Sequence, residues 1–286
     1  MKGISNRLFN LCFLCAIFGF CVAATAQCKY TTLNIPGAVT STAFGINDQG
    51  AIVGAFTTST TDDRGFLLFQ GQFSHFNFPG AESTEAEDIN NNGQIVGDYL
   101  NVKTGQHGFL VHNGVFSSFS DPSAPSQTQA LGINNFGTIV GMAGVNGFRL
   151  SGGKFTTIRF PGSTRTVAHG INDSGIIVGT YGDAKNFNHG FMLKNGVYTT
   201  IDFPGATDTA VNRIDNEGDI VGSYDINGGD VHGFTLDKGR FLTHDDPNAG
   251  MSTFILDVNK FDTIVGGYVD VGGHNHSFRA SCAGVF

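Results

Sequence analysis

The chain has no tryptophan, few charged side chains and few cysteines. Charged residues make up 14% of its 286 positions, and the formal net charge is −8. An acidic chain with few basic clusters binds nucleic acid poorly and is repelled by anionic lipid headgroups, so we expect neither as a partner. The absence of tryptophan excludes a sialidase-type Asp box, which requires that residue. The α/β-hydrolase nucleophile motif Gly-x-Ser-x-Gly is also absent.

Glycine and phenylalanine are abundant instead. The chain has 41 glycines and 27 phenylalanines. This composition is typical of many tight turns around a phenylalanine-rich core, and not of a disordered chain. No segment has a helical period long enough to compete with short β-branched runs, so the sequence predicts an all-β fold.

The first 26 residues have the pattern of a secretory signal peptide. Lys2 and Arg7 precede an apolar run over 8–23, and Ala-Thr-Ala at 24–26 has the small-x-small form of a cleavage site. A membrane anchor is the alternative, but the run is short and lacks a second charged flank. No later stretch is apolar enough to span a bilayer. We therefore predict a signal peptide at 1–26, a single domain at 27–286, and a secreted or periplasmic protein that is monomeric.

Two of the five cysteines remain after removal of the leader, one near each end of the chain. An oxidising compartment favours a disulfide between such a pair, Cys28 and Cys282. Two separate thiols are the alternative.

A nine-residue stretch, Ile-Asn-Asp-Gln-Gly-Ala-Ile-Val-Gly at 46–54, is the first of six similar copies at intervals of 38–44 residues. Each copy reads as two short strands joined by an Asn-x-x-Gly turn, followed by a Gly-Phe strand, a tight hairpin and a fourth strand. A breaker turn that contains proline then interrupts pairing, because proline has no amide hydrogen for the ladder. The predicted units lie near 38–80, 81–122, 123–162, 163–205, 206–247 and 248–286 plus 28–37.

Four antiparallel strands per unit predict a six-bladed β-propeller. The sixth unit stops after its third strand, while 28–37 matches the fourth strand and breaker of the fourth unit, 197–205. The N-terminal strand is therefore predicted to complete the last blade and close the ring, with the two cysteines on adjacent strands. An open solenoid is the alternative, and it leaves the split unit unexplained.

The repeated pattern resembles the HAF extracellular repeat family of exported bacterial proteins. The signature Gly-Ile-Asn-x-x-Gly-x-Ile-Val-Gly is followed by His-Gly-Phe at 107–109, 189–191 and 232–234. Glycine stands where the family name has alanine, and Arg64, Asn146 and a His-Ser-Phe variant at 276–278 depart further. The resemblance covers residues 27–286 and implies an exported β-repeat protein without an assigned activity.

Three repeated columns have structural interpretations. The Ser/Thr residues five positions before each Ile/Val are expected to cap the breaker turns. The glycine that ends each nine-residue stretch is expected to lie under a phenylalanine of the neighbouring unit. His107, His189, His232 and His276 begin equivalent strands of different blades, so we expect hydrogen bonds to nearby loops and no shared metal.

A group of acidic residues suggests an enzyme as the alternative to a binding protein. Glu85 and Glu87 should point near the central channel, with His169 in the same column as Glu87. Such a cluster could perform acid–base work as a hydrolase or lyase, or hold a cation. A solvated channel wall is the interpretation we favour, and we expect no cofactor and no metal. The Asn/Asp-rich turns could be calcium loops, but their backbone preferences already explain the composition.

Variable loops suggest where recognition occurs. The loops between the second and third strands differ most among the units, and they share one face of the ring with the breakers. These loops lie at 57–64, 100–106, 143–146, 182–188, 225–231 and 269–275. Because recognition usually sits in variable loops on a rigid scaffold, we expect this variable-loop face to bind a partner protein, glycan or envelope component. The short third loop predicts a notch beside blade three.

Overall fold

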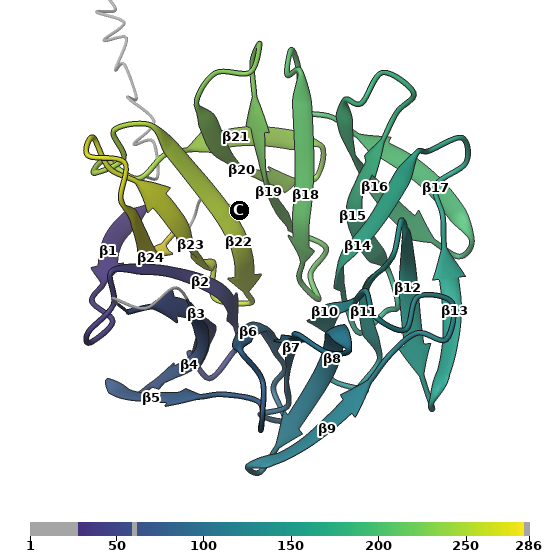
Figure 1. The fold of residues 1–286 in the computed structure, drawn as a ribbon. Helices are drawn as coiled ribbons and strands as arrows, with labels where there is room; N and C mark the ends of the chain where they lie inside the picture. The colour runs from purple at the N-terminus through teal and green to yellow at the C-terminus, as the bar shows by residue number, and fades with distance from the viewer. Residues whose placement is uncertain (1–27, 59–61, 283–286) are drawn as a thin grey trace, which may run out of the picture.

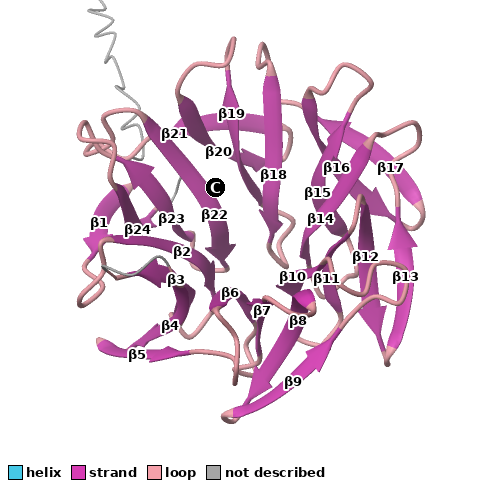
Figure 2. Ribbon diagram, viewed as in Figure 1, coloured by secondary structure: helices cyan, strands magenta, loops and turns pink. Residues whose placement is uncertain are grey.

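A computed structural model describes residues 28–58 and 62–282, and they form a six-bladed β-propeller (Figure 1). Each blade is one antiparallel sheet of four strands. Across these two ranges the chain consists of strands and loops without a helix (Figure 2), so no helix there is available to cross a membrane. The predicted signal peptide, 1–26, lies outside the described residues.

The first three blades follow one another along the chain. Blade 1 contains β2 (Thr40–Ile46), β3 (Ile52–Thr57), β4 (Asp63–Phe69) and β5 (Gln72–Phe76). Blade 2 contains β6 (Ser83–Ile89), β7 (Ile95–Asn101), β8 (Gly105–His112) and β9 (Val115–Phe119). Blade 3 contains β10 (Thr128–Ile133), β11 (Ile139–Ala143), β12 (Asn146–Ser151) and β13 (Lys154–Ile158).

The last three blades continue the ring. Blade 4 contains β14 (Arg165–Ile171), β15 (Ile177–Gly182), β16 (Asn188–Lys194) and β17 (Val197–Ile201). Blade 5 contains β18 (Asp208–Ile214), β19 (Ile220–Asp225), β20 (Val231–Asp237) and β21 (Arg240–His244). Blade 6 contains β22 (Ser252–Asn259), β23 (Thr263–Val269), β24 (Asn275–Ser281) and the N-terminal strand β1 (Lys29–Leu33).

The two ends of the chain meet in blade 6, as the split repeat predicts. Figure 1 shows the purple β1 beside the yellow β24, and the two strands pair antiparallel from Lys29↔Ser281 to Leu33↔Ser277. Cys28 and Cys282 lie next to the Lys29↔Ser281 end of this pairing, where they form a disulfide that spans 254 residues of sequence. Because the ring is closed, every blade packs between two other blades, and no blade has an exposed face at the end of a stack.

One phenylalanine per blade fills the space between the sheets. Phe66, Phe109, Phe148, Phe191, Phe234 and Phe278 are all fully buried. Each pairs in register with the glycine on the second strand of its own blade, for example Gly54↔Phe66. A Cβ on Gly54 would lie 2.0 Å from the Thr42 carbonyl and 2.7 Å from the Phe66 ring. The expectation that a neighbouring unit supplies this ring is therefore wrong, because strand pairing brings the glycine opposite its own Phe.

The five threonines of the Ser/Thr column cap the breaker turns, as predicted from the sequence, whereas the Ser41 hydroxyl accepts a hydrogen bond from Ser277. The Thr84 hydroxyl accepts a hydrogen bond from the Phe78 amide at 3.0 Å, and the Thr166 hydroxyl accepts one from Phe160. Equivalent bonds join Thr128 to Asp121, Thr209 to Phe203 and Thr253 to Asp246. Each threonine thus fixes the entry of its inner strand by satisfying a backbone amide.

The Asn-x-x-Gly turns also join neighbouring blades, a role that the sequence alone did not reveal. Asn47 Oδ1 accepts the amides of Gln49 and Ala51 in its own turn, while Nδ2 donates to the Asn90 carbonyl of the next blade at 3.2 Å. The same amide-to-carbonyl bond joins Asn90 to Asn134, Asn134 to Asn172, Asn172 to Asp215, and Asn259 to Asn47. This series is here called the asparagine ring.

The ring has one chemical interruption, at Asp215. Its carboxylate accepts the amides of its own turn, as an asparagine would, but it has no amide hydrogen for blade 6. Burial raises the pKa of Asp215 to about 7, and the charges of Asp219 and Glu217 add to the rise. When Asp215 is ionised, its side chain therefore cannot donate the hydrogen bond that the asparagines of the ring donate to the next blade.

We expect Asp215→Asn to stabilise the protein by about 1 kcal/mol, the contribution of one hydrogen bond. The folded protein binds the Asp215 proton more tightly than the unfolded chain, because the pKa rises from 3.8 to about 7. Wild-type stability should fall as pH increases between these two values, so the gain should be larger at pH 8 than at pH 4. Urea unfolding of both proteins at the two pH values measures it.

The reverse substitution, Asn172→Asp in blade 4, is the matched control, because it removes the amide that reaches Asp215. It should destabilise the protein at pH 8. Equal stability of D215N and wild type at both pH values would contradict the role assigned to the ring.

Candidate functional site

Every inner strand has a β-bulge that turns one additional side chain toward the central channel. The register shifts between Ala43 and Gly45 in β2, between Ala86 and Asp88 in β6, and at the same place in the other inner strands. Together with Arg213, one bulge residue from each inner strand lines a narrow neck of about 40 Å³: Phe44, Glu87, Leu131, His169, Asn212 and Leu256. The bulge explains why residues adjacent in sequence, such as Glu87 and Asp88, both take part in the channel.

Arg213 of β18 crosses the channel below this neck. Its guanidinium donates to the Glu87 carbonyl of blade 2 at 2.9 Å and to the His169 carbonyl of blade 4. It also lies 3.7 Å from an Asp88 oxygen and 3.5 Å from an Asp257 oxygen. Arg213 lines both the neck and the cup of about 110 Å³ on the turn face, where the asparagine ring lies. One buried side chain thus contacts three other blades and lies between the neck and the cup.

Glycines next to the bulges allow this close approach of the inner strands. A Cβ on Gly45 would lie 2.9 Å from Asp88 Cα, and one on Gly132 would lie 2.6 Å from the His169 carbonyl oxygen. Gly45, Asp88, Gly132, Gly170, Arg213 and Asp257 occupy equivalent positions in the six blades. We call this set the waist row.

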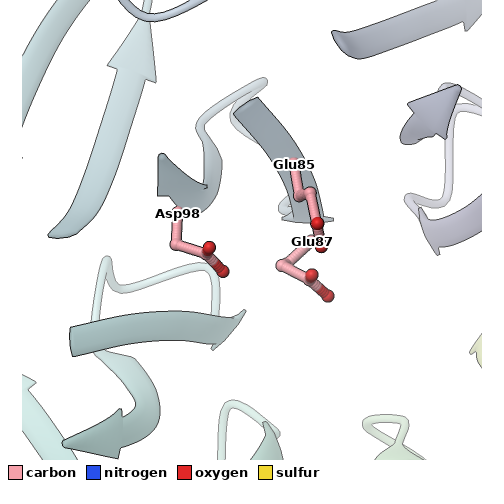
Figure 3. Close-up of side chains that lie close together, drawn as sticks. All are labelled: Glu85, Glu87 and Asp98. Atoms are coloured by element: carbon pink, nitrogen blue, oxygen red, sulfur yellow. The ribbon is translucent and has the colours of Figure 1, made fainter. Parts of the chain in front are cut away.

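Three carboxyl groups gather on the blade 2 wall of the channel. Figure 3 shows Glu85 and Glu87 on β6 and Asp98 on the neighbouring β7, with their carboxyl groups side by side. One oxygen of each lies within 4.8 Å of the other two. The sequence predicts Glu85 and Glu87 at the channel but misses Asp98. The signal was the strand register, because the turn at 90–93 places Asp98 opposite Glu85.

Burial and neighbouring acids raise the pKa values of all three acids, although the hydrogen bond between Glu85 and Glu87 lowers that of Glu85. Burial raises the pKa of Glu87 well above its ordinary value, and the charges of Asp98 and Glu85 raise it further. Burial also raises the pKa of Asp98 to about 7, with Glu85 adding to the effect. The pKa of Glu85 rises by burial and by the charge of Asp63. This carboxylate cluster therefore retains protons near neutral pH or binds a positive charge.

His169 faces the same neck as Glu87 but does not belong to the carboxylate cluster. Burial lowers the pKa of His169 to about 3, and the charges of Arg213 and Arg165 act in the same direction. Such an imidazole is neutral at pH 7 and is a weak base, since a general base works best with a pKa near the working pH. The structure brings Glu85 and Glu87 together, and gives His169 little capacity to accept a proton.

A larger pocket of about 310 Å³ opens on the variable-loop face over blades 4, 5 and 6. Arg165, Asn188, Asp208 and Asp225 supply polar groups at the strand ends, while Phe254 and Leu256 supply an apolar wall. Asp208 is held in place by the Asn188 amide, which donates to its Oδ1 at 2.6 Å. Blade 3 contributes no residue to this pocket, so the predicted notch beside blade three is not its origin.

Two buried hydroxyl groups line this pocket without a hydrogen-bond partner. Thr180 on β15 is 5% exposed and Ser223 on β19 is 6% exposed. Neither Thr180 Oγ1 nor Ser223 Oγ makes a hydrogen bond in the described structure. A buried hydroxyl without a partner costs about 1–3 kcal/mol, so two at one pocket point to groups that a ligand would satisfy.

The recurrent histidines serve the loops, as the sequence predicts. His189 Nδ1 lies 3.0 Å from Asp202, and His232 Nδ1 lies 2.9 Å from Asp245. Each ring also packs on a tyrosine of the second strand, with centroids 5.2 Å apart for Tyr181 and His189. A breaker phenylalanine stacks with that tyrosine, as Phe160 does with Tyr181 at 3.6 Å. Such stacks pack the breaker turns against the second strands of blades 2, 4 and 5.

No protein-family model and no curated protein matches the chain. Solved structures do match its fold, which defines the class of protein as a six-bladed β-propeller. A catalytically inactive virginiamycin B lyase from Staphylococcus aureus has a TM-score of 0.53 at 11% identity, covering 89% of this chain and 99% of that one. TolB from Acinetobacter baumannii has a TM-score of 0.56 at 12% identity, covering 82% of this chain and 64% of the TolB chain.

The match also extends to a six-bladed fungal lectin, that of Aleuria aurantia, which recognises fucose. Its TM-score is 0.51 at 10% identity, covering 87% of this chain and 93% of the lectin. At these identities the likenesses show a shared fold, and the activity of this chain must be argued from its own site.

Proposed function

We propose that this protein is an exported propeller of the HAF repeat type that binds a carbohydrate through the pocket on its variable-loop face. The observation that carries the proposal is the pair of buried, unpartnered hydroxyls, Thr180 Oγ1 and Ser223 Oγ, at a pocket of about 310 Å³. This volume is at the lower end of the range for small-molecule sites.

The chemistry of the walls suits a polyhydroxylated ligand. Arg165 offers a planar set of donors and Asp208 offers acceptors, a combination that can bind adjacent hydroxyl groups. Phe254 offers an aromatic side chain for the C–H groups of a sugar ring. The lectin likeness is compatible with this use of the fold. The Cys28–Cys282 disulfide supports export, since disulfides persist in oxidising compartments.

The matched variant Thr180→Val tests the proposal, because it removes the hydroxyl and keeps the shape of the side chain. We expect T180V to be more stable than wild type, since an unsatisfied buried group is removed, and to bind its glycan about tenfold more weakly. Thermal unfolding and titration with a glycan selected on an array measure the two effects.

Thr128→Val is the control, because the Thr128 hydroxyl is satisfied and lies in blade 3 outside the pocket. It should lower stability and leave binding unchanged. No binding by wild-type protein across the array, or equal binding by T180V, would contradict the proposal.

A further inference from the structure

The carboxylate cluster of Glu85, Glu87 and Asp98 lies on the opposite side of the channel from the pocket. Glu85 and Glu87 project from one inner strand, and Asp98 comes from the next strand of the same blade (Figure 3). Two adjacent strands of one sheet hold the three groups, so their positions are fixed by strand pairing and not by a mobile loop.

Asp98 has one buried oxygen without a hydrogen bond of good geometry, although the Gln129 side chain lies close enough to lower the pKa of Asp98. The side chain is 3% exposed, and Oδ2 accepts a hydrogen bond from Gln106 Nε2 at 2.6 Å. Oδ1 is buried and has no hydrogen-bond partner in the described structure. A carboxylate oxygen in this position is costly, because burial without a partner removes its hydration and gives nothing in return.

The surrounding charges do not neutralise the cluster. Asp63 of blade 1 adds a further negative charge near Glu85. Arg213 is the cation that acts on Glu87, and it is already engaged by Asp88 and Asp257. His169, which shares the neck with Glu87, is neutral at pH 7 because burial lowers its pKa to about 3. The acids of this wall therefore outnumber the one cation near them, Arg213, which they share with Asp88 and Asp257.

We propose that Glu85, Glu87 and Asp98 form a binding site for one calcium ion in the channel wall. Calcium binds carboxylate oxygens at about 2.3–2.6 Å, so two oxygens on opposite sides of the ion lie about 4.8 Å apart. The three oxygens of the cluster lie within this limit, 4.8 Å. A bound divalent ion satisfies Asp98 Oδ1 and removes the repulsion among the three acids. Water completes the coordination from the channel.

Calcium fits this site better than magnesium does. Magnesium requires oxygens at about 2.0–2.1 Å in a near-ideal octahedron, which would force the three carboxylates closer together on a rigid sheet. Zinc prefers histidine and cysteine ligands, and the cluster offers neither. The site therefore selects a hard cation with variable geometry.

Isothermal titration of the chelator-treated, full-length mature protein with CaCl₂ at pH 7.5 tests the site. We expect one saturable calcium ion per chain, release of protons on binding, and weaker binding of MgCl₂. Glu87→Gln and Asp98→Asn should each weaken calcium binding at least tenfold. Circular dichroism of both variants verifies that the propeller is folded, and Glu85→Gln provides a third variant at a more accessible side chain.

Glu82→Gln is the matched control, because Glu82 is an exposed acid beside β6 in the same blade. It should bind calcium like the wild type. Absence of saturable binding at millimolar calcium, unchanged affinity in D98N and E87Q, or tighter binding of magnesium would each overturn the calcium site. Thr180→Val should keep full calcium affinity, so failure of the carbohydrate proposal and failure of this one are separate results.

Discussion

Replacing Arg213 by methionine is expected to destabilise the propeller by about 3–5 kcal/mol, the usual loss when one partner of a buried ion pair is removed. The substitution leaves Asp88 and Asp257 buried without their cation, and it removes the donors to two carbonyls in blades 2 and 4. Urea unfolding of wild type and R213M measures the difference.

The loss should depend on pH in a defined direction. Burial raises the pKa of Asp257 to about 8, and Arg213 opposes that rise. Without Arg213 the pKa must rise further, so the folded variant keeps its proton above pH 8 where the wild type has released it. Wild-type stability then stops falling while that of R213M continues to fall. We expect a larger difference at pH 9 than at pH 6.

Arg213→Lys separates charge from geometry. Lysine keeps the positive charge but cannot reach two carbonyls with one planar group, so an intermediate loss is expected. An R213M protein with the wild-type urea midpoint at both pH values would show that the waist does not depend on this side chain.

Removing the Cys28–Cys282 disulfide should be the second large effect, a loss of about 4 kcal/mol. The bond spans 254 residues, so in the chain-entropy model its removal greatly increases the freedom of the unfolded chain. The pairing of β1 with β24 remains, and the folded ring should persist under mild conditions.

Guanidinium unfolding of the wild type and the Cys28→Ser, Cys282→Ser double variant measures the loss. The variant should also show a steeper denaturant dependence, since its unfolded state exposes more surface. Thiol titration of the denatured wild type should find no free cysteine. Equal midpoints, or two titratable thiols in the wild type, would contradict the stabilising bridge.

The architecture could be predicted from the sequence because it depends on repetition. Six copies of one strand–turn–strand pattern gave the number of blades, and the split sixth unit gave the closure through β1. The disulfide followed from that closure, since the strand pairing brings Cys28 and Cys282 together. These features need no knowledge of side-chain contacts between blades.

The parts that could not be predicted all depend on register or on contacts between blades. Asp98 joins the carboxylate cluster only because the β6–β7 pairing sets it opposite Glu85. The asparagine ring needs the distance between adjacent turns, which one repeat does not contain. The pocket depends on Thr180 and Ser223, small residues after a repeated glycine that have no distinctive pattern in the sequence.

The waist row limits how similar the six repeats can become through duplication or recombination. One arginine, two aspartates and three glycines meet there. Six arginines would repel one another at close range, and six glycines would leave the axis without a side chain to fill it. The two aspartates each also accept an amide of the next blade, Ile133 for Asp88 and Ile46 for Asp257. Each repeat therefore fits only its own position in the ring. A blade moved to another position would place the wrong residue in the waist row.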